Sequence, residues 1–190
     1  MRKEIVYFER SGPENTVETL KLAKERADDL GIRDIVVASS HGKTALKAAE
    51  FFDPEKNNLV AVTISESFKD FGWNMKPEEK EQLEKRGIKV LTSIHALGDN
   101  VGSAFTEKHG GLTFERVVRE TLYRFCQGMK VAVEIVLMAA DAGLIPVDRE
   151  VIAIAGTDRG ADTAIVVQPA YSRRFHELKI KEIIAKPREP

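Results

Sequence analysis

A polar segment with the residue types of an anion-binding loop follows a short apolar run that ends near residue 38. It combines hydroxyl groups with one histidine, one glycine and one lysine: Ser39, Ser40, His41, Gly42, Lys43 and Thr44. An alanine-rich stretch typical of a helix follows. Free N–H groups at a helix start, hydroxyl donors and a lysine charge all suit a phosphate. We therefore predict that this loop binds a phosphate or another anion.

Two other interpretations of the loop need weighing. Residues 42–44, Gly-Lys-Thr, match the end of a nucleotide-binding P-loop, but that motif requires a glycine five positions before Gly42, where Val37 stands. A Walker-type nucleotide triphosphatase is therefore not expected. Alternatively, Ser39 or Ser40 only caps the helix and Lys43 faces solvent, as at many helix starts. The sequence leaves this second interpretation open.

Polar residues also end two other apolar runs of strand character. Thr63, Ser65 and Glu66 lie at the end of the run 59–64. A polar turn follows the run 151–155 and consists of Gly156, Thr157, Asp158, Arg159, Gly160, Ala161 and Asp162. Because open α/β sheets bind ligands at the carboxyl ends of their strands, we expect these residues to share one site with the loop 39–44.

Several side chains near this predicted site have two plausible roles. Phe71, Trp73 or Met75 either covers an aromatic ring of a ligand or packs its own loop onto the body. Asp158, Arg159 and Asp162 are either acid–base groups or solvated residues of a polar turn.

The histidines and the cysteine suggest little further chemistry. The four histidines are far apart and show no paired metal-ligand spacing, so we predict no metal site: His41, His95, His109 and His176. Among them, His41 is the best candidate for proton transfer because it lies in the loop itself. Cys126 is expected to be an inert core thiol, although Lys130 one turn later leaves activation open.

The order of predicted elements indicates an α/β fold. Strand patterns cover residues 5–8, 34–38, 59–64, 88–91, 151–155, 163–168 and 178–184, and helical patterns cover 14–30, 43–52, 77–86, 113–125 and 128–142. Their alternation predicts a three-layer sandwich with a mostly parallel sheet. The short link after residue 155 predicts an antiparallel strand pair. Residues 92–111 are predicted to form a loop, and 178–184 an edge strand.

Composition limits the class of protein. The 190 residues are expected to form a single domain, 1–190, and the 29 basic against 30 acidic residues leave no basic patch for nucleic acid or a membrane surface. One cysteine excludes an intrachain disulfide and favours a reducing, cytoplasmic location. The apolar helix from residue 128 and the tail strand also favour a homo-oligomer.

Three segments, residues 35–45, 59–63 and 151–157, resemble in order the strands and turns of the pyruvate kinase C-terminal α/β domain. The helix 132–144 is similar to that of free-standing archaeal proteins described as pyruvate kinase C-terminal-domain-like. The resemblance implies a phosphate-binding loop at residues 39–44 and flavin mononucleotide (FMN) as the bound ligand. It does not imply an activity, and without the catalytic barrel the chain is not expected to be a pyruvate kinase by itself.

Three functions follow from these expectations. The first is a protein that binds a phosphate-bearing small molecule, FMN, at the carboxyl edge of the sheet. The second is a stand-alone regulatory module that senses a phosphorylated metabolite without enzyme activity. The third is a phosphotransferase or phosphatase.

Overall fold

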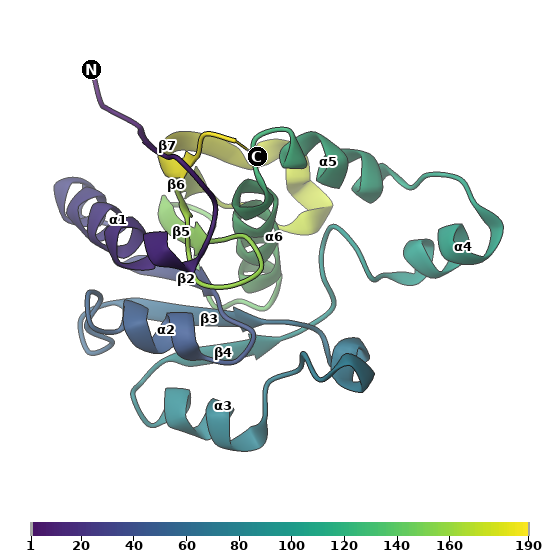
Figure 1. Ribbon diagram of the computed structural model, residues 1–190, viewed down its shortest axis with the longest axis horizontal. Coiled ribbons are helices and arrows are strands. Elements are labelled where there is room, and N and C mark those ends of the chain that lie inside the picture. Colours follow the sequence, from purple (N-terminus) through teal and green to yellow (C-terminus); the bar gives the residue numbers. More distant parts are fainter. Residues whose placement is uncertain (1, 190) are drawn as a thin grey trace.

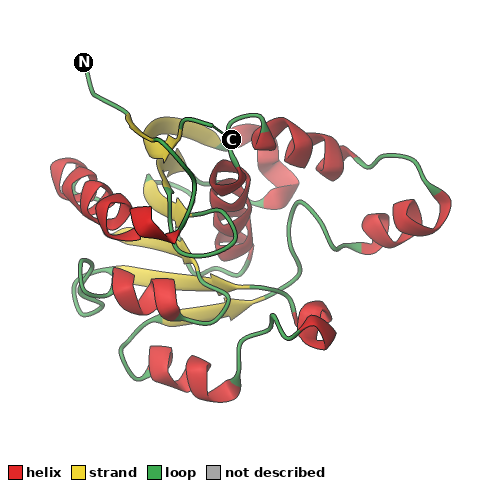
Figure 2. Ribbon diagram, in the orientation of Figure 1, coloured by secondary structure: helices red, strands yellow, loops and turns green. Residues whose placement is uncertain are grey.

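A computed structural model describes residues 2–189 and contains one seven-stranded sheet with helices on both faces (Figures 1 and 2). The strand order is β1-β7-β6-β5-β2-β3-β4. The strands are β1 (Val6–Phe8), β2 (Asp34–Ala38), β3 (Asn58–Thr63), β4 (Lys89–Thr92), β5 (Val151–Ala155), β6 (Thr163–Gln168) and β7 (Lys179–Pro187). Only β6 runs antiparallel to its neighbours. The predicted α/β sandwich is confirmed, with a second antiparallel pair, β6 with β7, beside the predicted one.

Six α-helices and three 3-10 helices complete the described residues. The α-helices are α1 (Thr16–Leu30), α2 (Lys43–Ala48), α3 (Pro77–Glu84), α4 (Val101–His109), α5 (Phe114–Tyr123) and α6 (Gln127–Asp141). The 3-10 helices are η1 (Pro13–Asn15), η2 (Glu66–Phe71) and η3 (Ser172–Glu177). None of the helices described within residues 2–189 is long and apolar enough to cross a membrane.

Alternate residues of the central strands fill two separate cores. In β2, Ile35 and Val37 join a core formed with α1, α2 and α3, whereas Val36 joins a core formed with α6. Successive side chains of a strand point to opposite faces, so a strand that is apolar throughout must be covered on both. This double cover fixes the register and therefore the position of the loops that follow each strand.

Helix α6 is buried on nearly every side because it lies between the sheet and α5. Its two charged buried side chains pair with each other, with Lys130 Nζ 2.5 Å from Glu134 Oε2. The other carboxylate oxygen of Glu134 accepts a hydrogen bond from the Leu97 N–H at 3.0 Å. The helix that was expected at the sheet or at a subunit contact is thus covered by its own chain.

Three expectations about element boundaries were wrong. A helix, α4, lies within the predicted loop 92–111, because Asn100 accepts a capping hydrogen bond from Ser103 N–H and Gly110, at φ 77°, ends the helix. Strand β7 is not an edge strand, because the N-terminal strand β1 pairs along its outer side. Helix α2 ends at Ala48, since residues 49–52 continue as turns.

Candidate functional site

The carboxyl ends of three neighbouring strands, β5, β2 and β3, bring the predicted site segments to one edge of the sheet (Figure 1). Val37 of β2 is paired with Ile154 of β5, so Ser39 and Gly156 leave adjacent strands two residues later. Thr63 of β3 is paired with Thr92 of β4. The loop 39–44, residues 63–66 and the turn 156–162 therefore leave the same edge, as the parallel sheet predicted.

The loop 39–44 presents a run of unused backbone donors. Within the described residues, the N–H groups of residues 40–44 donate no hydrogen bond, whereas the Ser39 N–H donates to the Val62 carbonyl at 2.9 Å. Gly42 adopts φ 79°, which a residue with a side chain rarely adopts, and its Cα faces Leu83. Ser40 and Lys43 are exposed, and Thr44 is half-buried. The loop can therefore offer amides, hydroxyls and one ammonium group to an anion.

His41 is held by an acidic neighbour on α3. Its Nδ1 lies 3.2 Å from Glu79 Oε2, and the same oxygen accepts a hydrogen bond from the Lys76 N–H at 2.8 Å. Burial raises the pKa of Glu79, but the Lys76 N–H and His41 outweigh it and keep this pKa below its ordinary value. The charged carboxylate therefore orients the ring of the residue predicted to transfer protons.

Residues 63–66 contribute less to a ligand site than the sequence suggested. Thr63 is buried, and its hydroxyl lies 2.6 Å from that of Thr92, so it joins the two strand ends. Ser65 caps η2 by accepting the Ser67 N–H at 3.3 Å. Glu66 is exposed and accepts a hydrogen bond from Asn74 at 3.3 Å. Of the three predicted residues, Glu66 alone is exposed.

The turn 156–162 is built around a buried carboxylate. Asp162 is 0% exposed, and its Oδ2 accepts hydrogen bonds from the N–H groups of Gly12 at 3.2 Å and Thr157 at 3.1 Å. Its Oδ1 accepts from the Thr163 hydroxyl at 2.8 Å. The prediction that Asp162 is a solvated turn residue was therefore wrong. Its carboxylate binds the Thr157 N–H of the same turn and is buried beneath it.

The rest of this turn divides into packed and exposed residues. A Cβ on Gly156 would lie 2.7 Å from the Gly160 carbonyl oxygen, so only glycine fits there. Ala161 is buried and donates its N–H to the Thr16 hydroxyl at 3.0 Å. Asp158 and Arg159 face solvent beside each other, 3.7 Å apart, and supply the exposed charges of the turn.

An aromatic cluster lies beyond the ends of β3 and β4. Phe68 stacks on Trp73 with ring centroids 5.6 Å apart and on His95 at 5.8 Å, and Phe71 lies 5.3 Å from Trp73. Phe71 and Trp73 are 67% and 51% exposed. Met75 is buried in the core and does not join them. The sequence did not predict that Phe68 and His95 join these rings, because no local pattern links the segments that carry them.

Two other groups have structural partners. Cys126 is buried at the start of α6, and its Sγ accepts the Met129 N–H at 3.3 Å, as expected of a core thiol. Lys130, the residue that left activation open, pairs with Glu134 instead. In the part of the chain that the structure describes, no group of three or more His, Cys, Asp or Glu residues is arranged to hold a metal ion.

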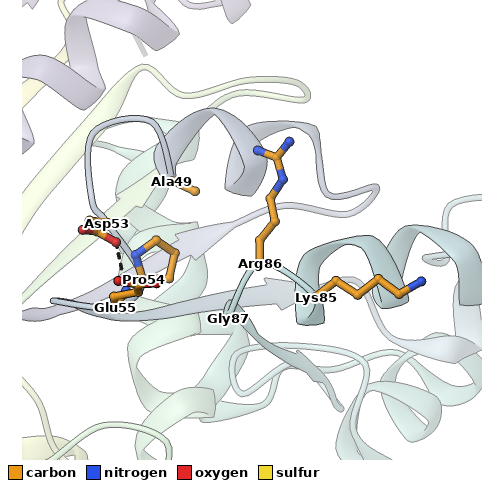
Figure 3. Close-up of a pocket in the computed structure, with 7 residues that line it drawn as sticks. All are labelled: Ala49, Asp53, Pro54, Glu55, Lys85, Arg86 and Gly87. Atoms are coloured by element: carbon orange, nitrogen blue, oxygen red, sulfur yellow. Dashed lines mark hydrogen bonds between the residues drawn. The ribbon is translucent and has the colours of Figure 1, made fainter.

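A surface depression lies at the opposite edge of the sheet. It lies between the connection from α2 to β3 and the connection from α3 to β4, and Figure 3 shows its lining residues: Ala49, Asp53, Pro54, Glu55, Lys85, Arg86 and Gly87. The Asp53 carboxylate there accepts the Glu55 N–H at 3.0 Å. Because these connections enter the amino ends of β3 and β4, the depression is separate from the carboxyl-edge segments.

Comparison with known protein families identifies the fold. The model of the pyruvate kinase alpha/beta domain matches residues 18–167, more than three quarters of the chain. This protein therefore belongs to the pyruvate kinase alpha/beta domain family, as the resemblance of its strands and turns implied.

Two solved structures are similar to the chain, and both are pyruvate kinases from Cryptosporidium parvum. One is 17% identical to this chain, with a TM-score of 0.44, and the matched region covers 82% of this chain and 23% of that pyruvate kinase. The other, a complex with ADP, is 18% identical, with a TM-score of 0.41, and the matched region covers 90% of this chain and 24% of that pyruvate kinase. The chain thus spans about a quarter of the length of these pyruvate kinases.

Proposed function

We propose that this protein binds a phosphate-bearing small molecule, FMN, at the carboxyl edge of its sheet. The observation that carries the proposal is the run of N–H groups at residues 40–44 that donate no hydrogen bond within residues 2–189. Consecutive free amides beside an exposed lysine are donors that suit a dianionic phosphate. Lys43 and Thr44 add an ammonium and a hydroxyl group, and Arg159 of the neighbouring turn adds a second exposed cation.

The aromatic cluster supports a ligand with a flat ring. Phe71 and Trp73 expose large ring surfaces beyond the carboxyl end of β3. The phosphate loop follows β2, the parallel neighbour of β3, and so leaves the same edge of the sheet. A planar heterocycle gains contact by stacking on such rings. FMN, which the family resemblance implies, carries a phosphate at one end and such a ring at the other. When bound, the flavin would supply the redox chemistry, while the protein binds and orients it.

The first test is an absorbance spectrum of freshly purified protein over about 300–550 nm, with mass spectrometry of any molecule that heat releases. A flavin band supports FMN, whereas a released sugar phosphate or nucleotide would retain the loop and exclude the flavin. Calorimetry of the ligand-free protein should then give tighter binding for FMN than for riboflavin, which lacks the phosphate.

Substitution of one lysine tests the site itself. Lys43→Ala should weaken FMN binding about 10-fold or more, the ordinary cost of losing a charged hydrogen bond. Lys47→Ala is the matched control, because Lys47 lies on the same helix and pairs with Glu50 at 2.6 Å. Equal affinities of the two variants would exclude residues 39–44 as the phosphate site.

A regulatory module without enzyme activity is the second candidate function. It is favoured because the candidate acid–base groups already have protein partners. Asp162 is buried and accepts three hydrogen bonds, and His41 contacts Glu79. Such a site has donors for binding but few free groups for proton transfer. A protein partner captured only in the presence of the ligand, with no turnover, would favour this function.

A further inference from the structure

Six large exposed apolar side chains lie on residues 100–125, the segment that carries α4 and α5 and is here named the arm. The arm extends to the right in Figure 1, and α4 lies far from the sheet. Its exposed apolar residues include Phe114, 91% exposed, and Leu112, 73% exposed. The full set is Val101, Phe105, Leu112, Phe114, Val117 and Phe125.

Both helices of the arm carry an apolar stripe that is exposed at least in part. On α4, Val101, Phe105 and His109 recur every four residues, and the rings of Phe105 and His109 stack at 6.3 Å. On α5, Val118 and Leu122 pack on the α6 core, whereas Phe114 and Val117, on the same apolar side of the helix, remain exposed. Residues spaced by three or four lie on one helix face, so each stripe is continuous.

Helix α4 lies on no covering surface among residues 2–189. It is nine residues long, and none of those residues is buried. Across residues 2–189, no other helix or strand packs extensively against it. Isolated helices shorter than about 12 residues are marginally stable in water. A partner that covers the stripe on α4 would stabilise both the helix and its exposed apolar residues.

We propose that the arm is the contact surface of a homodimer, in which the arm of one protomer packs against the arm of its partner about a two-fold axis. The six apolar residues expose on the order of 600 Å², with about 200 Å² for a fully exposed aromatic side chain. A standard interface buries about 800 Å² per partner, of which somewhat more than half is apolar. The arm therefore carries the apolar area of a whole dimer interface.

The charges of the arm select a second copy as the occupant. The arm carries charges of both signs in nearly equal number: Glu107, Lys108, Glu115, Arg116, Arg119, Glu120 and Arg124. A surface with both signs is complementary to itself when a two-fold axis relates the copies. The net charge of −1 adds little repulsion between copies. A membrane-binding helix would instead carry an excess of Lys and Arg beside its apolar face.

Sedimentation velocity of the full chain tests the dimer. The wild type should sediment at twice the chain mass of 21.2 kDa at micromolar concentrations. The double variant Phe105→Glu/Phe114→Glu should weaken dimerisation at least 100-fold and sediment as a monomer, because charges would then enter the interface. The matched control is Val17→Glu on α1, which is also an exposed apolar position but lies outside the arm and should remain dimeric.

Hydrogen exchange separates loss of the interface from loss of the fold. The amides of α4 should exchange slowly in the dimer and quickly in the double variant, while those of α6 stay protected in both. If α6 also loses protection, Phe114→Ser alone replaces the double variant in the same comparison. A monomeric wild type, or a dimer that survives substitution of the arm, would overturn the proposal. Binding of the monomer to anionic lipid vesicles would also overturn it.

Discussion

The hydroxyl oxygen of Ser39 accepts a hydrogen bond from the backbone N–H of Ala45 at 3.2 Å, which joins the end of β2 to the first turn of α2. Ser39 is 5% exposed, whereas the next residue, Ser40, faces solvent. The two serines of the predicted anion loop therefore differ: Ser39 acts as a capping residue, and Ser40 is free to contact a ligand.

Replacement of each serine by alanine should separate these two roles. Ser39→Ala should lower the free energy of unfolding by about 1 kcal/mol, the usual cost of a lost helix cap. Ser40→Ala should leave stability within about 0.5 kcal/mol of the wild type and weaken FMN binding. Urea denaturation and calorimetry measure the two effects. Equal stability losses for both variants would contradict the assignment.

Removal of the Asp162 carboxylate should be among the most damaging changes near the site. Asp162→Ala leaves the Gly12 and Thr157 N–H groups and the Thr163 hydroxyl without their acceptor. An unsatisfied buried donor costs about 1–3 kcal/mol, so a loss of roughly 3 kcal/mol is expected in denaturant titration. Asp158→Ala in the same turn, at an exposed position, should cost less than about 0.5 kcal/mol.

The ion pair between α1 and β7 should make stability depend on pH in the acid range. Two hydrogen bonds from the Arg26 guanidinium hold the pKa of Glu182 below its ordinary value near 4.5. A carboxyl whose pKa is lowered by folding stabilises the protein above its ordinary pKa, and this contribution is lost as the pH falls toward the folded-state pKa.

The variant Glu182→Gln isolates this contribution. It should be less stable than the wild type by roughly 2 kcal/mol at neutral pH, since it loses a charged pair of hydrogen bonds. The difference should shrink as the pH falls below about 4.5, where Glu182 of the unfolded wild type becomes protonated. Thermal unfolding across this range measures it, and a difference independent of pH would show that the charge does not matter.

Trp73 offers a direct optical test of the ring site. It is the single tryptophan of the chain and stacks on Phe68 at 5.6 Å. If the flavin ring contacts this cluster, titration with FMN should quench the tryptophan emission in proportion to occupancy. The control is free tryptophan titrated with FMN, which measures the emission lost only because FMN absorbs light. Trp73→Ala should also weaken binding about 5-fold or more, as expected for a lost aromatic contact. Unchanged emission at saturation would place the ring elsewhere.

Strand and helix patterns predicted most of the fold because the core strands are covered on both faces. The runs at 34–38, 59–64 and 151–155 are almost entirely apolar, and the structure places each inside the sheet. Helix α4 was missed because its residues never enter the core, so its weak pattern resembled a loop. The tail was mistaken for an edge strand because the sequence did not indicate that β1 would cover it.

The sequence by itself determined which residue types follow each strand, and hence a loop of hydroxyls, glycine and lysine at the carboxyl edge. Tertiary structure decided which of those groups are free. Thr63 and Asp162 satisfy partners far from them in sequence, and Ser39 accepts the N–H of Ala45 six residues on. The N–H groups of residues 40–44, in contrast, donate no hydrogen bond within residues 2–189. Hydrogen bonds between distant segments depend on packing, and local sequence patterns do not encode that packing.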